Sequence, residues 1–129
     1  MAQYRFDHVH LVSKDPLKTA EFYEKSQLAR EKSVNTLPDG RMLISLALGG
    51  ASIKISNPRA KALVPNTLPE GCGLEHFGMR TNNIEQAMVE LQANGAKFVQ
   101  GITQINPKTR IAFFVSPENV LIELLEIKD

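Results

Sequence analysis

The sequence predicts an α+β fold in which two βαβββ modules, about residues 4–57 and 73–127, form a curved mixed sheet around a cleft within a single domain, residues 1–129. The first observation behind this prediction is an internal repeat, because "FDHVHLVSKD" and "LEHFGMRTNN" begin similar units that align His8 with His76. The ends of the units match as well, since "ASIKIS" lies over "VLIELL" after one small gap and aligns Lys54 with Glu123. Duplication of one module accounts for both alignments.

The second observation is that each repeat begins with a strand and continues as a helix. The first strand runs from about Tyr4 to Ser13, because alternate side chains of this segment differ in character. One face of the predicted strand carries Phe6, His8, His10 and Val12. Asp15 suits the N-cap of the following helix, with Pro16 at its first position. In the second repeat Asn83 caps a helix whose apolar residues keep helical spacing until Gly95 ends it.

The third observation is that turn residues separate three further strands in each repeat. Asp39-Gly40 predicts a turn, and Gly49-Gly50 predicts a tight hairpin between "RMLISLAL" and "ASIKIS". The later strands of the second repeat are predicted to be "KFVQGITQ", "RIAFFVS" and "NVLIELLEI". The segment 57–73 is rich in proline and glycine and is predicted to link the two modules.

Composition argues against several classes of function. Lys and Arg number 15 against 14 Asp and Glu, and the resulting net charge of +1 favours neither nucleic acid nor an anionic membrane as a partner. The longest apolar runs are too short to span a bilayer, and the first residues lack the apolar core of a signal peptide. A single cysteine, Cys72, permits no intrachain disulfide and has no neighbouring base that would mark it as a nucleophile. We therefore expect a cytoplasmic protein.

Four polar residues stand out because of where the repeat places them. His8, His10 and His76 all lie on the predicted first strands, and Glu123 lies in an apolar final strand where an unpaired charge would be costly. A single strand histidine is usually a hydrogen-bonded structural residue, and a final-strand glutamate is often an edge residue that faces water. The symmetry of the repeat favours a site instead. Two neutral imidazoles and one carboxylate suit a divalent first-row metal ion.

The chain also resembles a known family over nearly its whole length. "DHVHLVSKDPLKTAEFY" is similar to the first strand–helix unit of the vicinal oxygen chelate superfamily, whereas "GLEHFGMRTNNIEQAMVELQANGAKF" and "IAFFVSPENVLIELLE" are similar to its second half. This superfamily includes glyoxalase I, methylmalonyl-CoA epimerase, extradiol dioxygenases, fosfomycin-modifying enzymes and metal-free bleomycin-binding proteins. The resemblance implies a glyoxalase-like fold, a small-molecule substrate and a homodimer. The apolar strands "MLISLAL" and "RIAFFVS" offer surface for such a dimer.

The resemblance also implies which residues hold the metal. The ligand positions of the family fall on His8, His76 and Glu123, and the fourth position falls on Lys54, whose ammonium cannot ligate a metal ion. Glyoxalase I and the epimerase carry a glutamate or a glutamine there, so Lys54 puts both activities in doubt. Extradiol dioxygenases and fosfomycin-modifying enzymes match better, because they use two histidines and one glutamate.

The function implied is that of a metal-dependent enzyme with Fe, Mn, Zn, Ni or Co as its divalent ion and a substrate with two vicinal oxygens. A glyoxalase-like lyase or isomerase is the first expectation, and a ring-cleaving extradiol dioxygenase is the named alternative. A metal-free small-molecule binding or resistance protein is the third. His10 and Lys54 are the candidate catalytic residues, although His10 could equally support a ligand or fill the core. Arg41, Arg80 and Arg110 could hold an anionic substrate or lie on the surface.

Overall fold

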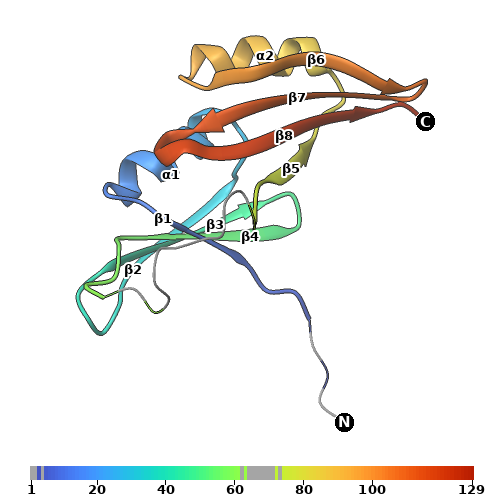
Figure 1. Ribbon diagram of the computed structural model, residues 1–129. Helices are drawn as coiled ribbons and strands as arrows, with labels where there is room; N and C mark the ends of the chain where they lie inside the picture. The colour runs from blue at the N-terminus through green and yellow to red at the C-terminus, as the bar shows by residue number, and fades with distance from the viewer. Residues whose placement is uncertain (1–2, 4, 62, 64–71, 73) are drawn as a thin grey trace. The chain divides into compact units, whose positions relative to one another are not determined.

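Each half of the chain folds into a four-stranded mixed sheet with one helix, in the order strand, helix and three strands (Figure 1). The computed structural model describes all residues except 1–2, 4, 62, 64–71 and 73. The chain divides into two compact units, residues 1–64 and 65–129. Much of the predicted linker, residues 57–73, lies outside the described residues. The predicted α+β fold of two βαβββ modules is confirmed.

The sheet of the first unit consists of three antiparallel strands and one strand that joins them in parallel. Its elements are β1 (Val9–Val12), α1 (Pro16–Lys25), β2 (Glu31–Thr36), β3 (Met42–Leu48) and β4 (Ala51–Ser56). The sheet has the strand order β1-β4-β3-β2, in which β1 runs parallel to β4 and the other pairs are antiparallel. Gly49 and Gly50 make the turn between β3 and β4, and both adopt positive φ angles, 55° and 93°, which glycine tolerates without strain.

The second unit repeats this topology. Its elements are β5 (Phe77–Arg80), α2 (Ile84–Ala93), β6 (Lys97–Asn106), β7 (Thr109–Ser116), the 3₁₀ turn η1 (Pro117–Asn119) and β8 (Val120–Ile127). The strand order β5-β8-β7-β6 matches that of the first unit strand for strand. Figure 1 shows α2 lying along β6 on one face of this sheet.

The ladder registers agree with the repeat at the level of single residues. In the first unit His10 is paired with Lys54 between β1 and β4. In the second unit Gly78 is paired with Glu123 between β5 and β8. Since Gly78 follows His76 by two positions, as His10 follows His8, the two registers are equivalent. Lys54 and Glu123 therefore occupy the same place in the two sheets.

Both helices begin at the predicted capping residues. The Asp15 carboxylate accepts a hydrogen bond from the Lys18 N–H at 3.2 Å, and the Asn83 side chain accepts one from the Gln86 N–H at 3.1 Å. These bonds satisfy N–H groups that lack partners in the first turn of a helix. Each helix is ten residues long. None of the helices in the described ranges is long and apolar enough to cross a membrane.

Each helix covers the apolar face of its own sheet. The core of the first unit is made by α1 and the inner strands, and its members include Phe22, Tyr23, Ile44, Leu46, Ile53 and Ile55. The core of the second unit is made in the same way, by Ile84, Leu91, Phe114, Ile122 and Leu124. Strand alternation sends the neighbours of these residues, including Lys54 and Glu123, to the opposite face of each sheet.

One boundary differs from the prediction. The first strand was expected from about Tyr4 to Ser13, whereas β1 covers only Val9–Val12. Its parallel neighbour β4 begins at Ala51, two residues before the first paired position at Ile53, because the Gly49-Gly50 turn precedes it. The ladder between β1 and β4 begins at the pair Val9–Ile53, and the strand begins with this pair. Alternation of side chains alone does not contain this information.

Candidate functional site

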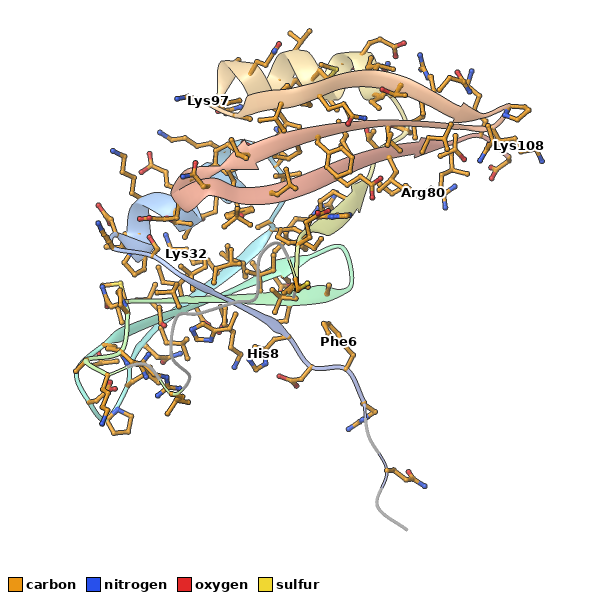
Figure 2. The ribbon with its side chains drawn as sticks, viewed as in Figure 1. Phe6, His8, Lys32, Arg80, Lys97 and Lys108 are labelled. Atoms are coloured by element: carbon orange, nitrogen blue, oxygen red, sulfur yellow. The ribbon has the colours of Figure 1, made fainter. Side chains whose placement is uncertain are left out.

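His8 and His76 share the same local arrangement in the two units. His8 lies on the segment that leads into β1 (Figure 2), and its Nδ1 contacts the Asp7 carboxylate at 2.7 Å. His76 lies directly before β5, and its Nδ1 contacts the Glu75 carboxylate at 3.0 Å. In both cases the acid is the residue before the histidine. Each hydrogen bond engages Nδ1 and leaves Nε2 for another partner.

In the second unit that other partner is Glu123. The His76 Nε2 lies 3.3 Å from the Glu123 Oε1, and the two side chains are only 29% and 19% exposed. The ring of Phe113 stands edge-on to the imidazole at 5.2 Å between centroids. Gly78, the ladder partner of Glu123, presents no side chain, and a Cβ added to it would lie 3.9 Å from the Glu123 Oε1. The structure thus brings together two of the three predicted metal ligands.

The third predicted ligand belongs to the other unit. His8 lies in residues 1–64, whereas His76 and Glu123 lie in residues 65–129. Over the ranges that the structure describes, no three His, Cys, Asp or Glu side chains are grouped so that they could hold a metal ion. The second unit contains two of the three predicted donors, His76 and Glu123.

His10 makes a different kind of contact from the other two histidines. Its Nε2 lies 2.7 Å from the Oγ of Ser56, which is fully buried and donates to the Asn57 carbonyl at 3.0 Å. Arg41 Nη1 reaches the same Oγ at 3.4 Å. Burial lowers the pKa of His10, and the positive charge of Arg41 lowers it further. His10 is consequently neutral at pH 7.

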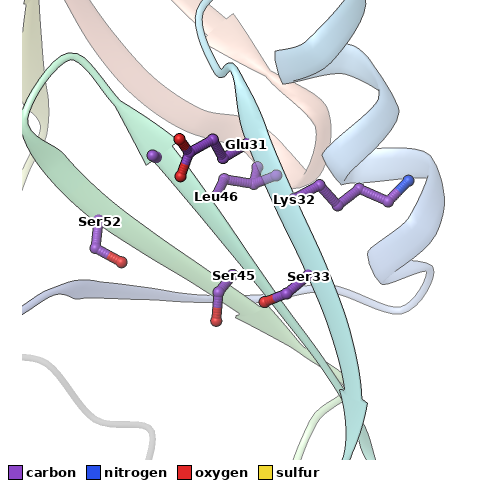
Figure 3. A pocket seen from close by; sticks show the side chains of 7 residues that line it. Glu31, Lys32, Ser33, Ser45, Leu46 and Ser52 are labelled. Atoms are coloured by element: carbon purple, nitrogen blue, oxygen red, sulfur yellow. The ribbon is translucent and has the colours of Figure 1, made fainter.

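Lys54 lies in a polar row that crosses the first sheet. The registers align Ser33 of β2 with Ser45 of β3, Ser45 with Lys54, and Lys54 with His10. Lys54 is half-buried, while Ile53 on the opposite face is buried. A shallow pocket of about 270 Å³ lies over β2, β3 and β4, and Ser33, Ser45 and Ser52 line it (Figure 3). Donor groups therefore concentrate on the face that also carries His10.

The three arginines that could have held an anionic substrate all have partners in the protein. Arg110 binds the Glu85 carboxylate through Nη1 at 2.5 Å and the Glu126 carboxylate through Nη2 at 2.6 Å. Arg41 Nε donates to Asp39 at 2.7 Å, and Arg80 Nη2 donates to a backbone carbonyl at 3.1 Å. These contacts give each arginine a structural role.

The cluster of Arg110 with Glu85 and Glu126 was not predicted from the sequence. Glu126 is 6% exposed and also accepts a hydrogen bond from the backbone N–H of Ile84 at 3.0 Å. This N–H and the Arg110 guanidinium hold the pKa of the Glu126 carboxyl below its usual value. A signal was available, because alternation places Glu126 on the core face together with Ile122 and Leu124, where a carboxylate needs partners.

The amino-acid sequence matches a known protein family over most of its length. A profile of the Glyoxalase/Bleomycin resistance protein/Dioxygenase superfamily matches residues 5–124. The chain belongs to this superfamily. Comparison with curated proteins gave no match. The resemblance to vicinal oxygen chelate proteins inferred from the repeat motifs is thereby confirmed.

Solved structures of this superfamily share the fold at low sequence identity. A glyoxalase family protein from Bacillus cereus has a TM-score of 0.78 and 17% identity, with 100% of this chain and 97% of that chain covered. A glyoxalase family protein from Enterococcus faecalis has a TM-score of 0.73 and 22% identity, with 95% and 97% covered. A fosfomycin resistance protein from Listeria monocytogenes has a TM-score of 0.71 and 17% identity, with 95% and 93% covered. At these identities the likeness shows the fold alone.

Members of the glyoxalase superfamily typically use divalent metals, and one pair of side chains in this chain offers donors that such an ion accepts. An imidazole nitrogen and a carboxylate oxygen lie close together in the second unit, and both are half-buried. A divalent ion accepts this pair of donors and would neutralise the half-buried carboxylate. The hydrogen bond between His76 Nδ1 and Glu75 orients the ring in the manner common for metal-bound histidines.

Proposed function

We propose that this protein is a divalent-metal-dependent enzyme in which His8, His76 and Glu123 hold the ion and a small substrate with two vicinal oxygens binds beside it. The observation that carries the proposal is the approach of His76 Nε2 to Glu123 Oε1 at 3.3 Å, with Nδ1 already engaged by Glu75. His8 joins the ligand set because it is the repeat equivalent of His76 and has the same contact with a preceding acid. Fe, Mn, Zn, Ni and Co all suit these donors.

A divalent ion at these ligands supplies Lewis-acid polarisation of the two substrate oxygens. The protein itself supplies two further groups on the first sheet, Lys54 and His10, which are ladder partners on its polar face. We assign to Lys54 the binding of a negatively charged oxygen of the substrate, because its ammonium offers three donors and no acceptor. We assign to His10 the transfer of a proton, because a neutral imidazole can accept one at pH 7.

The reaction class that we propose is a glyoxalase-like lyase or isomerase, in which a proton moves next to a carbonyl. A second candidate, an extradiol-type dioxygenase, is favoured by one observation. Lys54 occupies the place in the first sheet that Glu123 occupies in the second, so the protein offers three ligands and lacks a carboxylate at the fourth position. Three protein ligands leave room on an ion for a bidentate substrate and one more molecule.

The proposal is tested by measuring metal in protein purified without added metal, under aerobic and anaerobic conditions. We expect about one divalent ion per chain and strong loss of this metal in His76→Ala, because a three-ligand site loses one of its protein donors. His10→Ala is the matched control, since it removes a histidine that binds Ser56 instead. Unchanged metal content in His76→Ala would refute the assignment.

Activity then separates the two candidates. Turnover of α-ketoaldehyde adducts without oxygen uptake supports the lyase or isomerase. Oxygen uptake with simple catechols on the Fe(II)-loaded protein supports the dioxygenase. A protein that binds neither metal nor these substrates would instead be a metal-free binding or resistance protein, which the same superfamily also contains.

We also propose that the protein is a cytoplasmic homodimer with no nucleic-acid or membrane partner. The apolar strands β3 and β7 leave half-buried side chains such as Leu43 and Phe113 on the face opposite the cores, and the edge strands β2 and β6 expose Val34 and Val99. A second copy of the chain would cover such surface. Light scattering at micromolar concentration tests this, and a monomer would contradict it.

A further inference from the structure

We propose that Asp7 and Glu75 are positioning residues, each of which fixes the following histidine in the tautomer that presents an unprotonated Nε2 to the metal ion. This inference rests on the proposed metal site and adds two residues to it. It assigns a role to two exposed acids that would otherwise be taken for solvated surface charges.

The first argument is that the same contact forms in two units of the fold. In the first unit the carboxylate of Asp7 lies 2.7 Å from His8 Nδ1, and in the second the carboxylate of Glu75 lies 3.0 Å from His76 Nδ1. Asp and Glu differ in length by one methylene, yet both reach the same ring nitrogen. A contact that is kept despite a different side chain indicates a requirement for a carboxylate at that nitrogen.

The second argument comes from the third histidine, which serves as an internal comparison. His10 lies on the same strand segment as His8, but it follows Val9 instead of an acid. Its contact with Ser56 engages Nε2, the nitrogen that is left available in the other two histidines. The acid–histidine contact is therefore found at both proposed ligands and differs from the arrangement at His10.

The third argument is the chemistry of the imidazole ring. A neutral imidazole carries one proton, and the nitrogen without it is the one that can bind a metal ion. Of the two carboxylates near His76, Glu75 is the closer, at 3.0 Å from Nδ1, against 3.3 Å between Nε2 and Glu123. Glu75 thus holds the proton on Nδ1, and the lone pair of Nε2 faces the oxygen of its fellow ligand. Without Glu75 the proton would move to Nε2 and point at Glu123, where it would block the ion.

The test compares Glu75→Ala, Glu75→Gln and Asp7→Ala with the unchanged chain. Nitrogen-15 NMR of the metal-free proteins at about pH 8.5, well above the ordinary histidine pKa, reports which ring nitrogen carries the proton. Titration with Zn²⁺ in competition with a chelator reports affinity. Glu31→Ala is the control, because it removes an exposed carboxylate from β2, at the opposite edge of the first sheet from β1.

We expect His76 alone to change tautomer in Glu75→Ala and His8 alone to change in Asp7→Ala, with His10 unchanged in both. Affinity for Zn²⁺ should fall about tenfold in each alanine variant, the lower end of the range for residues that support a metal ligand, because both acids are largely exposed. Glu75→Gln should recover most of the loss, since the amide oxygen still accepts the Nδ1 proton.

Three outcomes would overturn the inference. The first is a Glu75→Ala protein in which His76 keeps its proton on Nδ1. The second is a loss of affinity no larger than that of Glu31→Ala, and the third is a Glu75→Gln protein as weak as Glu75→Ala, because the effect would then come from charge and not from position. Failure of the proposed function looks different, since His76→Ala itself would then leave Zn²⁺ binding unchanged.

Discussion

Replacing Glu126 by alanine should destabilise the second unit by releasing the start of α2. The Glu126 carboxylate accepts from the backbone N–H of Ile84, the first residue of α2, and from the Arg110 guanidinium. Ile84 is fully buried, so its N–H has no water to replace the lost acceptor. Arg110 keeps one partner in Glu85, which is itself exposed.

The size of the effect follows from the buried backbone donor. Leaving the Ile84 N–H unpaired costs about 1–3 kcal/mol. For a chain of this length each kcal/mol lowers the melting temperature by about 4 °C, so the expected drop is about 4–12 °C. Glu126→Gln should lose much less, because its amide oxygen can still accept from Ile84. Circular dichroism during thermal unfolding measures all of these variants.

The matched control is Glu85→Ala, which removes the other carboxylate on the same arginine. Exposed ion pairs contribute little to stability, so this variant should melt close to the unchanged protein. A drop in Glu85→Ala as large as that in Glu126→Ala would show that the ion pair matters and not the buried N–H. A Glu126→Ala protein that melts within about 1 °C of the unchanged chain would also contradict the reasoning. Such a change in melting temperature is less than a third of the smallest expected drop.

Three further predictions concern pH, the space beside Glu123, and Lys54. The pKa of the Glu126 carboxyl is lowered in the folded protein. The stabilising contribution of this carboxylate is therefore present above the unfolded pKa of about 4.3 and is lost as the pH falls through the lower folded pKa. Melting temperatures measured from pH 7 to 3 should fall more steeply in the unchanged protein than in Glu126→Gln. Gly78→Val should retain the fold, because the added Cβ would meet only the flexible tip of Leu125 closely, at 3.0 Å, and circular dichroism checks this. The same substitution should weaken Zn²⁺ binding, because the Cβ would lie 3.9 Å from the Glu123 carboxylate, and titration with Zn²⁺ measures the affinity. Lys54→Gln should leave the metal content unchanged and raise the KM for an anionic substrate several-fold, whereas unaltered kinetics would make Lys54 a solvated surface residue.

The internal repeat carried most of what could be predicted from the sequence. Its alignment of Lys54 with Glu123 agrees with the ladder registers, and local patterns within each repeat placed both helices, both caps and the hairpin turn at Gly49-Gly50. These features depend on local patterns, namely alternation, helical spacing and turn residues, which a sequence records directly.

The features that were missed depend on contacts between distant residues. Arg110 and Glu126 lie on neighbouring strands, and only the register of β7 with β8 brings them into the same ladder pair. The extent of β1 likewise depends on where its ladder with β4 begins, at the pair Val9–Ile53. The acids before His8 and His76 were visible in the sequence, but an exposed carboxylate beside a histidine has no distinctive pattern until the hydrogen bond to Nδ1 is known.

Equivalent positions in the two units carry the same residue at one place and different residues at another, which indicates different roles for the two units. The histidine that follows an acid is kept in both units, as His8 and His76, together with its bond to that acid. The ladder pair two residues further on has diverged completely, to His10 with Lys54 in the first unit and to Gly78 with Glu123 in the second. The second unit thus pairs a carboxylate with a residue that leaves space beside it, which suits an ion. The first unit pairs the Lys54 ammonium, which cannot bind a metal ion, with the His10 imidazole, and in the proposed function this pair binds the charged and proton-bearing oxygens of the substrate. In the proposed function, the histidine kept in both units serves as a metal ligand, whereas the diverged pair serves the ion in the second unit and the substrate in the first.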